Sequence, residues 1–101
     1  MKLVRDKIPD IIKGAGRECK YYVASHDEYE ARLYEKLHEE IDEFINEPCP
    51  EEAADIYEVF SSICALHDMS MFQVEIAAVD KRKARGSFDN RIILEDVSEN
   101  R

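Results

Sequence analysis

The chain has 101 residues, of which 45% are hydrophobic and 37% charged, and its formal net charge is −9. This length fits one small domain, and a composition with only three glycines and three prolines is typical of a compact helical protein, not of a disordered segment. Because a strongly negative chain repels nucleic acid and anionic lipid, we expect a single domain over 1–101 that binds no DNA or RNA polymer and no membrane.

The first expected element is a short helix from Lys7 to Lys13, with Pro9 in its first turn and Gly14 or Gly16 ending it. The next segment, 20–24, has strand propensity because it contains two tyrosines and a valine. Segment 91–94, near the end of the chain, has the same propensity. The two could pair as a small sheet at one end of a helical bundle.

Two long helices are expected after segment 20–24. The residues Ser25-His26-Asp27-Glu28 form a capping box, in which serine and glutamate satisfy each other's backbone amides, and predict a helix to about Asn46. Pro50 suits the first turn of the next helix, whose apolar positions continue to Leu66.

A third long helix completes the expected set. Ser70-Met71-Phe72-Gln73 repeats the capping signature, and the helix runs to about Ala84, with Gly86 placed for a left-handed C-terminal cap. The fold class is therefore all-α, a helical bundle. Since three helices with wide apolar faces cannot cover themselves in so short a chain, we expect oligomerisation to at least a dimer.

Two carboxylate clusters border the apolar faces of the first two long helices. At 100° per residue, Glu40, Glu43 and Glu47 lie along the edge of a stripe made by Leu33, Leu37, Ile41 and Phe44. In the next helix Glu52 falls on the row of Ile56, Val59 and Ile63, and Asp55 lies about a sixth of a turn away. A carboxylate in an apolar row is costly unless it is paired or binds a metal.

An antiparallel arrangement of these helices, joined by residues 46–50, would bring the clusters face to face. It would offer four carboxylates as hard oxygen ligands with no charged partner of opposite sign between them, which suits Mg²⁺ or Mn²⁺. The alternative is that a chain with 23 acidic residues places such patterns on solvated helix faces by chance. The alignment of both clusters with apolar rows favours the metal site.

The cysteines and the N-terminus indicate a cytoplasmic protein. Cys19, Cys49 and Cys64 form no C-x-x-C pair and are odd in number, which is typical of a reducing compartment. Charged residues begin at Lys2, too early for a signal sequence, and no apolar stretch approaches the ~18 residues of a membrane helix.

The order of the polar motifs resembles one enzyme superfamily. Glu39-Glu40-x-x-Glu43, Glu52-x-x-Asp55 and Lys81-x-x-x-Arg85-Gly86-x-Phe88 are similar to the motifs of MazG-like all-α nucleoside triphosphate pyrophosphohydrolases. The opening Val4-Arg5-Asp6-Lys7-Ile8-Pro9 resembles the small single-domain house-cleaning branch, also described as phosphoribosyl-ATP pyrophosphohydrolase-like. The resemblance spans nearly the whole chain and implies a bundle completed by association into dimers.

The resemblance also implies an activity, Mg²⁺-dependent cleavage between the α and β phosphates of a nucleotide to give the monophosphate and pyrophosphate. It implies that Glu39 orients or deprotonates the attacking water. The metal ligands implied by the resemblance are Glu40, Glu43, Glu52 and Asp55.

Basic residues are expected to bind the substrate phosphates. Lys81 and Arg85 lie four residues apart on one helix face, and the alternative is that they complement the dipole at the helix C-terminus. Further candidates are Arg5, Lys7 and Arg91, because arginine suits bidentate phosphate binding. No motif marks base recognition; Tyr29, Phe44, Tyr57 and Phe60 could stack on a base, although aromatic residues at helical spacing more often belong to a core.

Two other functional classes are alternatives to the hydrolase. Glu35-x-x-His38 is the ligand pair of di-iron carboxylate bundles, but neither His26 nor His67 follows a glutamate at the required spacing. A non-catalytic nucleotide sensor or interaction module on the same scaffold is the second alternative. All the acids of the resembled motif are present, which favours the enzyme.

Overall fold

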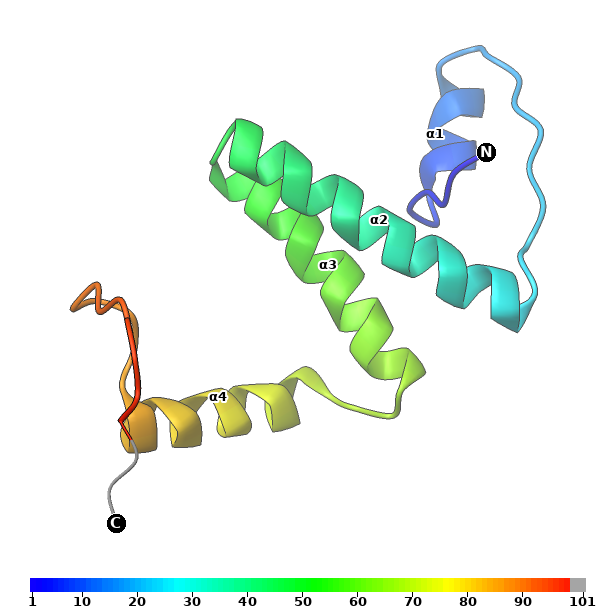
Figure 1. The fold of residues 1–101 in the computed structure, drawn as a ribbon. Helices are drawn as coiled ribbons and strands as arrows, with labels where there is room; N and C mark the ends of the chain where they lie inside the picture. Colours follow the sequence, from blue (N-terminus) through cyan, green and yellow to red (C-terminus); the bar gives the residue numbers. More distant parts are fainter. Residues whose placement is uncertain (99–101) are drawn as a thin grey trace. The chain divides into compact units, whose positions relative to one another are not determined.

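The computed structural model describes residues 1–98 and is all-helical in that range, with no strand (Figure 1). The four helices are α1 (Ile8–Gly14), α2 (His26–Asn46), α3 (Pro50–Leu66) and α4 (Met71–Arg85). The predicted all-α class is therefore confirmed, as are the predicted helices within one or two residues. No helix among the described residues is long and apolar enough to cross a membrane.

The chain divides into two compact units, Met1–Ser70 and Met71–Arg101. The first unit contains α1, α2 and α3. The second contains α4 and, among its described residues, an irregular segment over 86–98. The single domain predicted for 1–101 stays a prediction.

Local signals in the sequence account for the helix ends. The Ser25 hydroxyl accepts a hydrogen bond from the Glu28 backbone N–H at 3.3 Å, so the first half of the predicted capping box is confirmed. Pro50 occupies the first turn of α3. Backbone N–H groups in the first turn have no carbonyl partner within the helix, so proline costs no hydrogen bond there. Gly86 follows α4 with φ of +83°, and its N–H donates to the Arg82 carbonyl at 2.8 Å.

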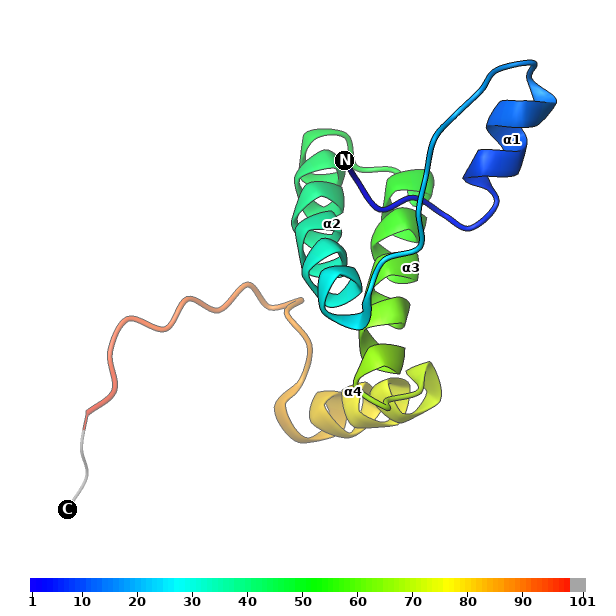
Figure 2. The same ribbon diagram turned by 90° about the vertical axis from the view of Figure 1, so that its right-hand side faces the viewer.

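Helices α2 and α3 form an antiparallel hairpin, and their facing sides make the core of the first unit (Figure 2). Leu33 of α2 is buried against Val59 and Ile63 of α3. Four partly buried side chains pack around this centre, namely Leu3, Tyr29, Leu37 and Leu66. The predicted apolar rows therefore meet at Leu33, Leu37, Val59 and Ile63, whereas Ile41 of the α2 row is exposed.

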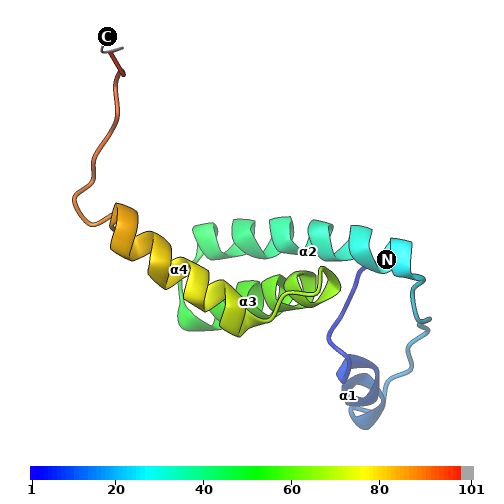
Figure 3. The ribbon, with the colours of Figure 1, turned by 90° about the horizontal axis from the view of Figure 1, so that it is seen from below.

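Helix α1 is set apart from this hairpin, and the N-terminal arm runs from it toward α2 (Figure 3). The arm is anchored by Leu3, which packs against the core. Helix α1 ends as the glycines predict, because Gly16 has φ of +78° and its N–H donates to the Lys13 carbonyl at 2.9 Å. The chain then returns through residues 17–24 to the start of α2.

The two segments with strand propensity do not form strands. Residues 20–24 are irregular, and residues 91–94 belong to the other unit and are also irregular. Arg91 has φ of +54°, which breaks an extended backbone at the first residue of its segment. An isolated two-stranded ribbon is marginal in water, so propensity alone is insufficient to form one.

The small core predicts a sharp sensitivity to truncation at Leu33, which is 2% exposed. We expect Leu33→Ala to lower the free energy of unfolding by about 2–5 kcal/mol, because it removes buried methyl groups and leaves a cavity. Urea denaturation followed by circular dichroism measures this loss. Leu94→Ala is the matched control, since Leu94 is 75% exposed, and equal losses in the two variants would contradict this core.

Candidate metal centre

The hairpin brings three of the predicted acids together. Glu40 comes from the fourth turn of α2, and Glu52 and Asp55 come from the first turns of α3, three residues apart on one side of that helix. One carboxylate oxygen from each residue lies within 4.8 Å of the other two. The face-to-face meeting of the two clusters is therefore confirmed for these three side chains.

Glu40 is the buried member of the group, with 5% of its surface exposed. Its Oε1 lies 3.4 Å from the ammonium of Lys36, one turn earlier on α2. Its Oε2 is buried and accepts no hydrogen bond within residues 1–98. Burial, and then the negative charge of Glu43, raises the pKa of Glu40 above its ordinary value, against the opposing effect of Lys36.

Glu52 presents a second buried oxygen without a donor. The side chain is half-buried on the apolar side of α3, and its Oε2 also accepts no hydrogen bond within the described residues. A buried carboxylate oxygen that lacks a partner costs free energy. Two such oxygens in one group are the strongest structural sign that this position suits a cation.

Asp55 is paired with the N-terminal arm. The Arg5 Nη2 donates to Asp55 Oδ1 at 2.7 Å, and both side chains are partly open to solvent, at 56% and 40% exposed. The expectation of four acids without a partner of opposite charge was therefore wrong. Lys36 compensates Glu40 from within α2, and Arg5 compensates Asp55 from a segment fifty residues earlier.

Glu43 and Glu39 do not join the group of three. Glu43, predicted as a fourth ligand, is exposed on α2 and acts on Glu40 through its charge. Glu39, predicted to act on the attacking water, is half-buried on the same helix. Adjacent residues of a helix point in directions about 100° apart. The side chain of Glu39 therefore points away from the direction in which Glu40 faces α3.

The predicted phosphate-binding residues fall in both units. Arg5 reaches the acidic group, and Lys7 is an exposed residue at the start of α1. Lys81 and Arg85 are exposed in the last turns of α4. Arg85 and Arg91 both line a cavity of about 380 Å³ formed by residues 85–92 within the second unit.

The donor set fits a hard divalent cation. Three carboxylates supply only oxygen ligands, which Mg²⁺ and Mn²⁺ prefer, and two of them have buried oxygens without donors. The one group of this kind among the described residues consists of carboxylates alone and includes neither Glu35 nor His38 of the E-x-x-H pair. Lys36 and Arg5 would compete with a bound cation for Glu40 and Asp55.

Comparison of the chain with protein-family models, with curated proteins and with solved structures gave no match.

The raised pKa of Glu40 predicts that the free energy of unfolding depends on pH when a chelator is present. Under these conditions no divalent cation balances the negative charge of the three carboxylates. The folded protein takes up the proton at a higher pH than the unfolded chain does, so the ionised carboxylate lowers stability above its folded pKa. As pH falls from the folded pKa of Glu40 toward the ordinary glutamate value, we expect the free energy of unfolding of the wild type to rise relative to that of Glu40→Gln.

Urea denaturation of both proteins over a series of pH values in EDTA measures this difference, which cancels the titration of the other acids. Glu58→Gln, at an exposed position of α3, is the control. If the wild type and Glu40→Gln keep a constant stability difference across that pH range, Glu40 does not have a raised pKa.

Proposed function

We propose that the protein is a Mg²⁺-dependent nucleoside triphosphate pyrophosphohydrolase, able to use Mn²⁺ as well, that yields a nucleoside monophosphate and pyrophosphate in nucleotide-pool house-cleaning. One observation carries the proposal: Glu40, Glu52 and Asp55 meet across two helices with ligand oxygens within 4.8 Å. The order of motifs along the chain, from Val4-Arg5-Asp6 to Arg85-Gly86-x-Phe88, supports this activity over other uses of an acidic site.

The reaction needs positive charge that this chain lacks overall. A nucleoside triphosphate carries about four negative charges, and phosphoryl displacement depends on positioning and on stabilising charge at the phosphate oxygens. Bound divalent cations supply that stabilisation and lower the pKa of coordinated water. With a net charge of −9, the protein would use its carboxylates to hold cations and a subset of its 14 arginines and lysines to hold phosphate.

Each predicted residue has a role in this proposal. Glu40, Glu52 and Asp55 hold the cation, and Glu43 increases the negative potential at Glu40. Glu39 orients the attacking water or accepts its proton, with its half-buried position on α2 limiting its rotation. The phosphate-binding candidates are Arg5, Lys7, Lys81, Arg85 and Arg91.

Removing a ligand charge tests the proposal. We expect Glu40→Gln and Asp55→Asn each to reduce Mg²⁺-dependent turnover by at least ~100-fold, because each leaves the carboxylate group one anion short. The assay incubates protein with Mg²⁺ and a panel of ordinary, deoxy and modified nucleoside triphosphates, and separates monophosphate plus pyrophosphate from diphosphate plus phosphate.

Glu58→Gln changes the same net charge at an exposed site of α3 and should retain full turnover. Wild-type activity in both Glu40→Gln and Asp55→Asn would contradict the hydrolase mechanism. Nucleotide binding by the wild type without any turnover would instead support the sensor alternative.

We also propose that two copies associate through the outer face of the hairpin. Only four hydrophobic side chains are buried within residues 1–98, whereas several large ones on α2 and α3 stay exposed. These are Tyr34, Ile41, Ile45, Tyr57 and Phe60. Several exposed apolar side chains beside so small a core are typical of a protein that buries more surface between subunits.

Sedimentation equilibrium tests this association directly. We expect a mass of at least twice the 11.8 kDa of one chain for the wild type, and a shift toward one chain for Ile45→Glu, because Ile45 is 70% exposed and a charge there would be desolvated by a partner. Glu58→Gln should sediment as the wild type does. A wild-type mass of one chain at micromolar concentration would refute the proposed interface.

A further inference from the structure

The first unit contains a cavity that is lined in part by the opening Val4-Arg5-Asp6 motif. Its volume is about 1000 Å³, and its lining comes from residues 1–6 and Pro9, from the irregular segment 20–25 and from the first turns of α2. Cavities of some 300–1,000 Å³ are the usual size for small-molecule and cofactor sites. The space is therefore large enough for a nucleoside phosphate.

Three tyrosine rings line this cavity, namely Tyr21, Tyr22 and Tyr29. Tyr21 and Tyr22 are 59% and 58% exposed, so their rings are open to a ligand. Tyr29 packs against the core and is held by it. Planar bases stack on aromatic side chains with little dependence on base identity, so such a lining suits a nucleobase.

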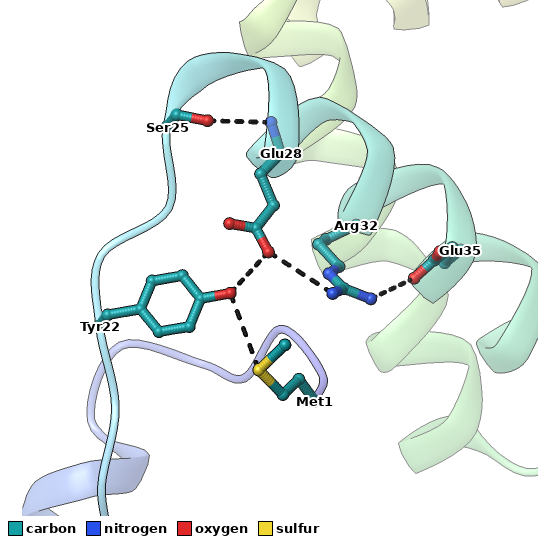
Figure 4. A network of polar contacts seen from close by, with 6 residues as sticks. All are labelled: Met1, Tyr22, Ser25, Glu28, Arg32 and Glu35. Atoms are coloured by element: carbon teal, nitrogen blue, oxygen red, sulfur yellow. Dashed lines mark hydrogen bonds and ion pairs between the residues drawn. The ribbon is translucent and has the colours of Figure 1, made fainter.

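A network of polar contacts holds Tyr22 in place (Figure 4). Its hydroxyl donates to Glu28 Oε2 at 2.6 Å, and the same carboxylate oxygen lies 3.5 Å from Arg32, which also donates to Glu35 at 3.1 Å. The hydrogen bond to Glu28 raises the pKa of Tyr22, so the phenol stays protonated as a donor. One wall of the cavity is therefore positioned before any ligand binds.

The charges of the lining suit an anion. Lys2, Arg5 and Lys20 are basic, whereas the acids are Asp6 and Glu28, and the charge of Glu28 is balanced by Arg32. The cavity is thus locally basic on a chain whose net charge is −9. A local excess of positive charge attracts phosphate that the rest of the surface would repel.

Arg5 connects the cavity to the acidic group. The side chain lines the cavity, and its guanidinium donates to Asp55 at 2.7 Å. All the residues concerned belong to the first unit. A ligand with its aromatic part on the tyrosines and its charged part at Arg5 would therefore reach the carboxylates that are proposed to hold Mg²⁺.

We propose that this cavity is the nucleoside site of the enzyme, with the base stacked on Tyr21 and Tyr22 and the phosphates directed to Arg5 and the carboxylates Glu40, Glu52 and Asp55. The inference rests on the proposed function, because it names where that substrate's base binds. A substrate that fits this cavity combines a planar ring with a phosphate chain.

The test measures affinity without turnover. Isothermal titration calorimetry is performed with Mg²⁺ and a panel of α,β-methylene analogues of ordinary purine and pyrimidine nucleoside triphosphates, which cannot be cleaved at the reacting bond. We expect Tyr21→Ala to raise the Kd about 10-fold or more through the loss of one stacking surface, and Tyr21→Phe to restore it. The matched control is Phe72→Ala, because Phe72 is an aromatic residue, 72% exposed on α4 and outside the cavity lining.

The outcomes separate this inference from the proposed function. Turnover by the wild type, with equal Kd values in the wild type, Tyr21→Ala and Phe72→Ala, would overturn the cavity as nucleoside site while leaving the hydrolase intact. Analogue binding that depends on Tyr21, without turnover of any nucleotide, would support the site and reject the hydrolase. Absence of analogue binding by the wild type would overturn the inference.

A second copy of the chain is the competing occupant. Hydrogen exchange of residues 20–25, followed at increasing protein concentration and with added analogue, distinguishes the two. Protection that appears with the analogue at constant oligomeric state supports the nucleoside site. Protection that follows protein concentration alone, and does not respond to the analogue, overturns it.

Discussion

The packing of α2 against α3 is the contact on which the rest of the first unit depends. Leu33 meets Val59 and Ile63, and this small apolar centre fixes the rotation of both helices about their axes. Once these rotations are set, Glu40 must face α3, and Glu52 must face α2. The same contact that supplies most of the buried apolar surface therefore also brings the carboxylates together, so the candidate site cannot form without the core.

That meeting of carboxylates is electrostatically costly in itself. Burial and neighbouring acids raise the pKa of Glu40, and two buried oxygens lack donors within the described residues. The chain offsets part of this cost with two internal cations, Lys36 from the preceding turn of α2 and Arg5 from the N-terminal arm. Two carboxylate oxygens of the group still lack a donor within the described residues. In the proposed function, Glu40, Glu52 and Asp55 would hold a divalent cation that balances this charge, and Arg5 would be a candidate to bind phosphate.

Much of this arrangement was predictable from the sequence, because it depends on local rules. Ser25, Pro50 and Gly86 mark helix ends through backbone hydrogen bonding and φ preference, and the row of Glu52, Val59 and Ile63 follows from helical periodicity. The ion pair of Lys36 with Glu40 could also be predicted from the sequence, since residues four apart lie on the same face of a helix. The ion pair of Arg5 with Asp55 and the tyrosine-lined cavity could not, because both depend on how an irregular arm folds onto a distant helix. The strand predicted at 20–24 from residue propensity was wrong. The Tyr22 hydroxyl contacts Glu28 there, and no partner strand is present among the described residues.

A crystal structure of the protein grown with Mn²⁺ tests most directly whether Glu40, Glu52 and Asp55 form one divalent cation site. Data collected at the manganese absorption edge locate the ion independently of any assumed mechanism. We expect an anomalous peak bonded to oxygens of all three residues, with Arg5 displaced from Asp55. An acidic group without a peak, in which Lys36 and Arg5 still pair with Glu40 and Asp55 at saturating Mn²⁺, would contradict this expectation.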